Sequence, residues 1–227
     1  GVFSSRTVHA AGVACFLLAG VAMLPAILHR GWPLALLLVS SCAAGYAYTG
    51  GPYPLGYHGL GDITVVVFFG LVATGGIRFI HGGGMFLTVP TAVASLQVGL
   101  LCAALLAINN LRDMTTDGLV GKNTLPVVYG LRFGRWEVTG LVLVPFALNM
   151  YWVLGLGGGC WHAAALSSLS APVAVHIVRR VWVYEPPTPR FNGLLATAAL
   201  LHLLFGALLA AGVVLGDQPV HLLHHQG

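Results

Sequence analysis

Apolar residues form seven long runs along the chain, which cover residues 8–27, 33–48, 62–80, 86–108, 136–155, 161–182 and 192–215. Most approach the roughly 20 residues that a helix needs to cross a bilayer, and the second, which contains Gly45, is the shortest. Lipid offers no partners for backbone polar groups, so spanning segments of this length must be helical. The pattern therefore predicts an all-α, polytopic membrane bundle of seven spans around a central cavity.

Composition supports the same class. Charged residues make up only 7% of the 227 residues and hydrophobic residues 57%, and the mean hydropathy is +0.88. These values are far from those of an ordinary soluble domain, so the lipid bilayer is an expected partner. The net charge of +4 needs no nucleic acid to explain it, because the basic residues follow a topological pattern.

Eight of the ten basic residues fall before the first run, between the fourth and fifth, or between the sixth and seventh, which places them on one side of the membrane. The exceptions are Arg30 and Arg78. The positive-inside rule then places residues 109–135 and 179–191 in the cytoplasm, or in the stromal or matrix compartment of an organelle. We expect an integral protein of a bacterial inner membrane or an organelle membrane.

The segment 108–125, "INNLRDMTTDGLVGKNTL", gathers polar side chains directly after an uncharged run. If the helix continues, the spacing places Asn110, Asp113 and Asp117 on one face. A neighbouring face with the same spacing carries Asn109, Arg112 and Thr116. Carboxylates at the end of a membrane helix are costly to desolvate and often mark a substrate or ion path.

These residue types suit a diphosphate held by magnesium. Mg²⁺ prefers one or two carboxylates together with phosphate oxygens and water, so Asp113 and Asp117 are candidate metal ligands. Arg112 and Lys122 are candidates to neutralise the remaining phosphate charge, which stabilises the diphosphate as a leaving group. A structural alternative stays open, in which Asp113 pairs with Arg112 or Lys122 at a solvated helix end.

The stretch "NNLRDMTTDGLVGKNTL" resembles the second aspartate-rich motif of the UbiA superfamily of intramembrane prenyltransferases, in the form found in 1,4-dihydroxy-2-naphthoate prenyltransferases. A second segment, "YAYTGGPYPLGYHGLGD", is similar to the Tyr-rich loop that precedes this motif in the family. A third, "RRVWVYEPPTPRFNGLLA", is similar to the last cytoplasmic loop of its phytyl-transferring branch. The resemblance extends along the whole chain, and we treat residues 1–227 as one transmembrane prenyltransferase-like domain.

The resemblance implies transfer of a polyprenyl or phytyl group from its diphosphate to dihydroxynaphthoate, in menaquinone or phylloquinone synthesis, with Mg²⁺ as cofactor. It implies that Asp113 and Asp117 bind the metal and that Arg112 and Lys122 act on the diphosphate. Residues implied to contact the substrates are Asn109, Asn110, Tyr46, Tyr48 and Asp62.

Three departures from the family pattern bear on activity. The family has nine helices and a first motif of the form Asn-Asp-x-x-x-Asp, which this sequence lacks, so we expect that two amino-terminal helices are missing. Gly118 and Val128 stand where the family usually has basic residues. Positive charge near the diphosphate is thereby reduced.

Three classes of function follow. The first is a magnesium-dependent aromatic prenyltransferase. The second is a degenerate, inactive relative that serves as a structural or lipid- or quinone-binding subunit beside other membrane-protein subunits. A transporter ranks last, because the sequence lacks the repeat symmetry and paired broken helices typical of that class.

Overall fold

The computed structural model describes residues 4–82, 84–154 and 160–216, and within them every regular element is a helix. The amino-terminal part contains α1 (Ser5–Arg30), α2 (Trp32–Thr49), the short 3₁₀ turn η1 (Leu55–Tyr57), α3 (Gly61–Val65), the π-helix η2 (Val66–Val72) and α4 (Ala73–Gly82). The remainder contains α5 (Val89–Leu119), α6 (Leu125–Tyr129), α7 (Leu131–Ala147), α8 (Asn149–Leu154), α9 (Trp161–Ser168), α10 (Ala171–Val183) and α11 (Arg190–Gly216). The prediction of an all-α membrane bundle is confirmed.

The described residues of the seven apolar runs are mainly helical, but the prediction of seven spans is too high, because fewer helices are long and apolar enough to cross a membrane. Within the described ranges, five helical segments are long and apolar enough to cross a membrane, and α9 with α10 makes a sixth if this pair, bent by 50°, counts as one span. Helix α2 has 18 residues, about 27 Å at 1.5 Å per residue, and is not among them. Its end, "GYAYT", is more polar than its start.

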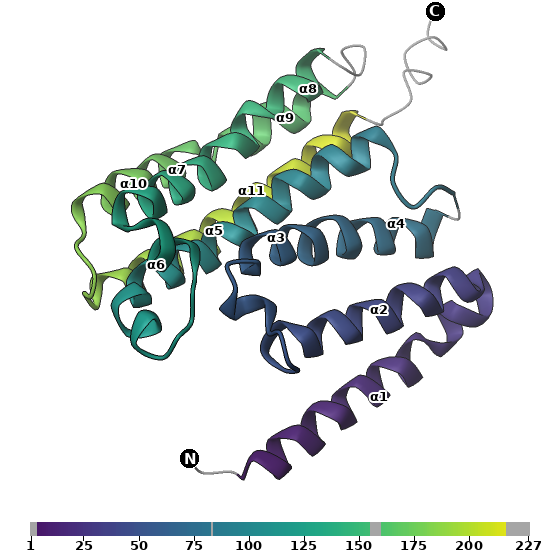
Figure 1. Cartoon of the computed structure of the whole chain (residues 1–227). Helices are drawn as coiled ribbons and strands as arrows, with labels where there is room; N and C mark the ends of the chain where they lie inside the picture. Colours follow the sequence, from purple (N-terminus) through teal and green to yellow (C-terminus); the bar gives the residue numbers. More distant parts are fainter. Residues whose placement is uncertain (1–3, 83, 155–159, 217–227) are drawn as a thin grey trace, which may run out of the picture.

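Helix α5 is the centre of the fold. It packs against η2, α7 and α11, and its buried residues are spread along it from Ser95 to Leu111. Helix α1 lies at the opposite extreme, because none of its residues is buried and it packs against α2 at the edge of the molecule (Figure 1). The core consequently lies among α5, α7, α9, α10 and α11.

Two glycines allow η2 to approach α5 at backbone distance. A methyl group placed on Gly70 would lie 2.6 Å from the carbonyl oxygen of Ser95, and one placed on Gly99 would lie 2.9 Å from Gly70 Cα and Val66 O. Small residues of this kind let membrane helices pack closely where no hydrophobic force drives them together.

A buried polar network joins α5 to the second half of the chain. Gln97 donates to Pro145 O and to Asn149 Oδ1 at 2.8 and 2.9 Å, and Trp152 Nε1 donates to Gln97 Oε1 at 2.9 Å. Asn149 Nδ2 in turn donates to Ser167 Oγ at 3.0 Å. Each of these polar groups has a hydrogen-bond partner. The network therefore fixes how α5, α8 and α9 pack without the free-energy cost of an unsatisfied polar group in the core.

The two ends of the bundle carry different numbers of basic residues, as the run pattern predicts. Arg30 donates to Ile80 O at 2.8 and 2.6 Å, which joins the end of α1 to the end of α4 at one end of the molecule. The end of α5 and the start of α11 lie at the other end (Figure 1). Asp113 and Asp117 are therefore at the opposite end from Arg30 and Arg78.

The close contact between η2 and α5 gives a stability prediction. Gly99→Ala should lower the stability by about 1–3 kcal/mol, because the added methyl group meets backbone atoms that cannot move aside cheaply. Thermal unfolding in detergent measures this loss. Gly206→Ala is the matched control, since a methyl group there meets nothing within 4 Å. Equal melting temperatures for the two variants would contradict the packing described here.

Candidate functional site

The polar segment 109–119 continues α5 without a break, as its spacing predicts. Helix α5 is 31 residues long and ends at Leu119, so Asp113 and Asp117 lie one turn apart on its last turns. Leu111 and Asn110 are buried, whereas the side chains of Asp113 and Asp117 are partly exposed. The site therefore lies where the buried helix emerges from the bundle.

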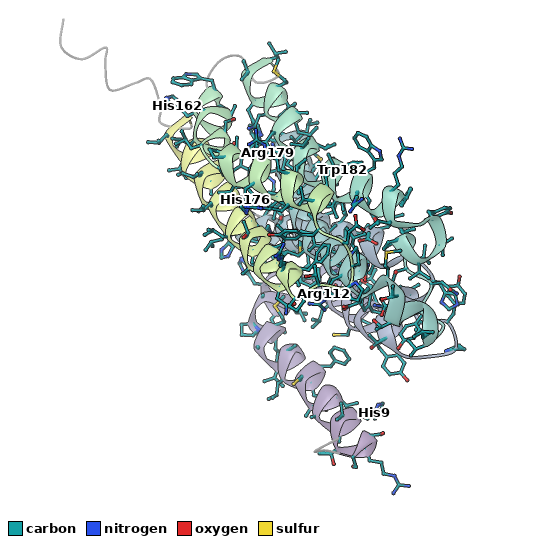
Figure 2. All side chains as sticks on the ribbon, turned by 90° about the vertical axis from the view of Figure 1, so that its left-hand side faces the viewer. His9, Arg112, His162, His176, Arg179 and Trp182 are labelled. Carbon is teal, nitrogen blue, oxygen red and sulfur yellow. The ribbon has the colours of Figure 1, made fainter. Side chains whose placement is uncertain are left out.

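Arg112 holds several parts of this end together. Its Nε and Nη2 donate to the two carboxylate oxygens of Asp113, each at 2.7 Å. Nη2 also donates to Asn109 Oδ1, and Nη1 donates to Asn192 Oδ1 at the start of α11, both at 2.8 Å. A guanidinium is suited to this task, because its planar fork of donors can serve a carboxylate and two amides at once. Figure 2 shows Arg112 near the start of α11, with His162 at the far end of the bundle.

Lys122 forms the second ion pair. The chain turns after α5 at Gly121, which has a φ of 71° that favours glycine. Lys122 then folds back, so that its Nζ lies 2.8 Å from Asp117 Oδ2. The two carboxylates of α5 are thus matched by two cations, and the structural alternative of ion pairing at the helix end is present in the structure.

A hollow of about 400 Å³ opens beside Arg112 and Asp113, between the end of α5 and the loop before α11. Thr116 and Asn192 line it together with residues 187–189. Its walls thus combine a cation, a carboxylate and neutral hydrogen-bonding groups. Such a set can take an anionic head group if the arginine exchanges its carboxylate partner for the ligand.

The Tyr-rich loop lies against the loop that carries Lys122. The amide of Asn123 donates to Tyr57 O at 2.9 Å, and a methyl group on Gly59 would lie 3.4 Å from Asn123 O. Gly59 itself has a φ of 71°. The two segments that carry the family resemblance are therefore neighbours in space, although about 60 residues separate them in the chain.

The structure separates Tyr46 from Tyr48. Tyr48 is half-buried, and a methyl group on Gly61 would lie 3.1 Å from its hydroxyl oxygen, which places that hydroxyl beside the start of α3 and Asp62. Tyr46 is exposed and faces His9 of α1, with ring centroids 6.4 Å apart. A substrate role for Tyr46 beside Tyr48 stays a prediction, but the two side chains do not line one wall.

A larger hollow, of about 690 Å³, lies between α2 and the helical segment from α3 to α4. Its walls are mainly apolar and include Phe68, Phe69 and Val72, and Tyr48 lines it as well. The π-helix η2 forms much of one wall. Such helices are rare and frequently mark functional sites.

Three polar residues near the site were not selected from the sequence. Asn192 lies in the segment already noted before the last span, and only the fold shows that it meets Arg112. Thr124 is buried beside the Lys122 loop. Glu137 lies near the start of α7 and has a buried carboxylate oxygen. In the sequence it could have been recognised as a single acidic residue inside an apolar run.

Fold and site together define a multi-pass helical membrane protein with ion-paired carboxylates at one end of its central helix. The model of the UbiA prenyltransferase family matches residues 1–192, and the chain belongs to this family.

Curated relatives agree with this assignment. The chain is similar to the 1,4-dihydroxy-2-naphthoate octaprenyltransferase of Haemophilus influenzae, with 34% identity over 180 residues that cover 78% of this chain and 56% of the relative. It is 29% identical to the 2-carboxy-1,4-naphthoquinone phytyltransferase of Synechocystis over 203 residues, which cover 87% of this chain and 64% of the relative. The chain thus spans between half and two thirds of the length of these relatives.

The four hydrogen bonds of Arg112 predict a dynamic coupling. Arg112→Gln should speed amide hydrogen exchange in residues 187–192, because the link from α5 to Asn192 is lost. Hydrogen exchange with mass spectrometry measures this change. Arg132→Gln, at an exposed arginine of α7, should leave exchange in that loop unchanged. Equal protection in the wild type and the Arg112 variant would show that this bond does not hold the loop.

Proposed function

We propose that this protein transfers a polyprenyl or phytyl group from its diphosphate to 1,4-dihydroxy-2-naphthoate, as a step in menaquinone or phylloquinone synthesis. The observation that carries the proposal is the pairing of Asp113 and Asp117 with Arg112 and Lys122 at one end of α5, in a member of a prenyltransferase family. The relatives' names supply the naphthoate acceptor.

The carboxylates fit a magnesium ion as part of a shared site. Two carboxylates one turn apart are the number that Mg²⁺ usually takes from a protein when phosphates supply further oxygens. Phosphate oxygens of the diphosphate and water would supply the remaining ligands of the ion. When bound, Mg²⁺ would neutralise charge on the diphosphate and make it a better leaving group.

Arg112 and Lys122 supply the positive charge that the protein itself offers. Each is bound to a carboxylate through short hydrogen bonds, so the site is close to neutral before substrate enters. A bound diphosphate would add negative charge and its metal would add positive charge. The cations would then pair with the diphosphate and the carboxylates with the metal, without leaving any charge unpaired. Asn109 and Asn192 keep the guanidinium in place during this exchange.

Topology in the membrane follows from the same proposal. The end of the bundle that carries Arg112, Lys122 and Arg135 would face the cytoplasm, the stroma or the matrix, in keeping with its excess of basic residues. The prenyl chain would lie among the apolar helices, and residues 1–227 would act as one transmembrane domain.

The alternative of an inactive structural subunit is not favoured. It rests in part on Gly118 and Val128, which stand at exposed positions where the family usually carries basic residues. The curated relatives that the chain matches include prenyltransferases named for the naphthoate reaction, and the ion-paired carboxylates are in place.

Binding of a diphosphate provides the first test. Asp113→Asn and Asp117→Asn should each weaken Mg²⁺-dependent binding of a non-reactive prenyl diphosphate analogue by about tenfold or more, because a charged partner of the metal is lost. Isothermal titration in detergent measures the affinity. Glu185→Gln is the control, since Glu185 pairs with Arg135 at an exposed position. Unchanged affinity in both aspartate variants would remove the metal role.

Turnover provides the second test. Residues 1–227 alone, supplied with Mg²⁺, an allylic diphosphate and 1,4-dihydroxy-2-naphthoate, should form little or no product, whereas a version that also carries the two further helices with an Asn-Asp-x-x-x-Asp motif should form a prenylated product that mass spectrometry detects. Lys122→Met in the longer version should reduce the rate by about a hundredfold or more, the usual effect of removing one electrostatic group from such a site. Diphosphate binding by the longer version without any product would instead support the inactive subunit.

A further inference from the structure

Four arginines at the polar end of the bundle are exposed and take part in none of the ion pairs of the described residues. They are Arg132, Arg179, Arg180 and Arg190. They lie at the start of α7, the end of α10 and the start of α11. The helices from α1 to α4 contribute one arginine, Arg6, to the same end. Unpaired positive charge is therefore concentrated on one flank of the bundle, which is more than a preference for one side of the membrane requires.

Aromatic rings join these arginines into one surface. Trp136 of α7 and Trp182 of α10 pack edge to face, with ring centroids 5.0 Å apart. Arg132 lies four residues before Trp136 and therefore shares a helix face with that ring. Arg179 lies three residues before Trp182 and shares a face with it on α10 (Figure 2). We call the four arginines with Trp136, Trp182 and Tyr184 the arginine-aromatic surface.

Tyr184 holds two of the arginines close to each other. The guanidinium carbons of Arg180 and Arg190 each lie 5.9 Å from the centroid of its half-buried ring. Both distances are within the range of a cation–π contact. Two like charges around one ring repel each other, so an anion that binds between them relieves that repulsion and gains two favourable interactions.

Arg135 fixes the geometry of this surface. Its Nε donates to Val181 O at 3.1 Å and its Nη2 donates to Tyr184 O at 2.9 Å, which joins α7 to the carbonyl groups at the end of α10. Nη2 also donates to Glu185 Oε1 at 2.7 Å. These contacts hold the two helices in register and engage the neighbouring carboxylate. The four exposed arginines are left available for an external anion.

The level of the surface in the membrane indicates which anion it meets. Trp and Tyr side chains are enriched at the level of the lipid head groups, and Trp136 and Trp182 are 57% and 36% exposed at the polar end of the bundle. Basic pockets between membrane helices bind anionic head groups, and the planar fork of arginine suits phosphate oxygens. We infer that the arginine-aromatic surface binds the head group of an anionic phospholipid.

Such a lipid acts on a loop that borders the candidate site. Residues 187–189 line the hollow beside Arg112, and Arg180 and Arg190 lie before and after this segment. A phosphate bound by both arginines therefore connects the end of α10 to the start of α11 across the loop. The inference concerns lipid binding and does not rest on the proposed prenyl transfer.

The test titrates the intact protein in detergent with dioleoyl phosphatidylglycerol or dioleoyl phosphatidylcholine, and native mass spectrometry counts the bound lipids. The wild type should bind the anionic lipid about tenfold or more tightly, because each arginine near the head groups strengthens its binding. Arg180→Gln combined with Arg190→Gln should remove most of this preference. Arg6→Gln combined with Arg78→Gln removes the same charge elsewhere and should keep it.

A second variant and a second measurement locate the site. Arg132→Gln combined with Arg179→Gln changes two exposed side chains of the same surface and should also lower the preference, which keeps the test decisive if the first variant does not fold. Phosphatidylglycerol should slow amide hydrogen exchange in residues 180–192 of the wild type. It should not do so in the variant that lacks Arg180 and Arg190.

Several outcomes would overturn the inference. These are equal affinity of the wild type for the two lipids, a preference that survives in both arginine variants, and an equal loss in the control variant. Displacement of phosphatidylglycerol by a similar concentration of inorganic phosphate would assign the surface to a soluble anion instead. Mg²⁺-dependent binding of the diphosphate analogue should be unchanged in the variant that lacks Arg180 and Arg190, and its loss there would assign these arginines to the substrate site. Failure of the wild type to bind that analogue would count against the proposed function alone.

Discussion

The need to satisfy polar groups away from water governs this structure, and α5 is where that need is greatest. Its first two thirds pack in the apolar bundle and its last turns carry charges, so one helix lies partly in an apolar environment and partly in a polar one. It meets the need with Gln97 in the interior and with ion pairs at its end. Close approach at Gly70 and Gly99 then holds the site-bearing helix against η2.

The sequence predicts much of the fold because lipid leaves few choices. Apolar run length alone locates the helical segments, although it gives more spans than the structure has, and basic residues assign the two ends. The short α2 was predictable from its run, but the bend between α9 and α10 was not. Bends depend on contacts between segments far apart in the chain, and a window of hydropathy contains no such contacts.

The candidate site was partly predictable for a similar reason. The spacing of Asp113 and Asp117 predicts that they share one face of a helix, because local helix geometry fixes how such positions align. Asn192 and Thr124 belong to other segments, and only tertiary packing brings them near α5. Glu137 is a charged residue near the start of an apolar run, and nothing in its local spacing indicates that its carboxylate is buried.

The π-helix at Val66–Val72 has a consequence for how this protein can vary. A π-helical segment accommodates an extra residue without breaking the helix around it, so one residue can be gained or lost there. Such a change would rotate everything before the segment relative to everything after it. Asp62 would turn about the helix axis while α4 kept its place, so a change in chain length at this point would reorient the start of α3 without any substitution among its side chains.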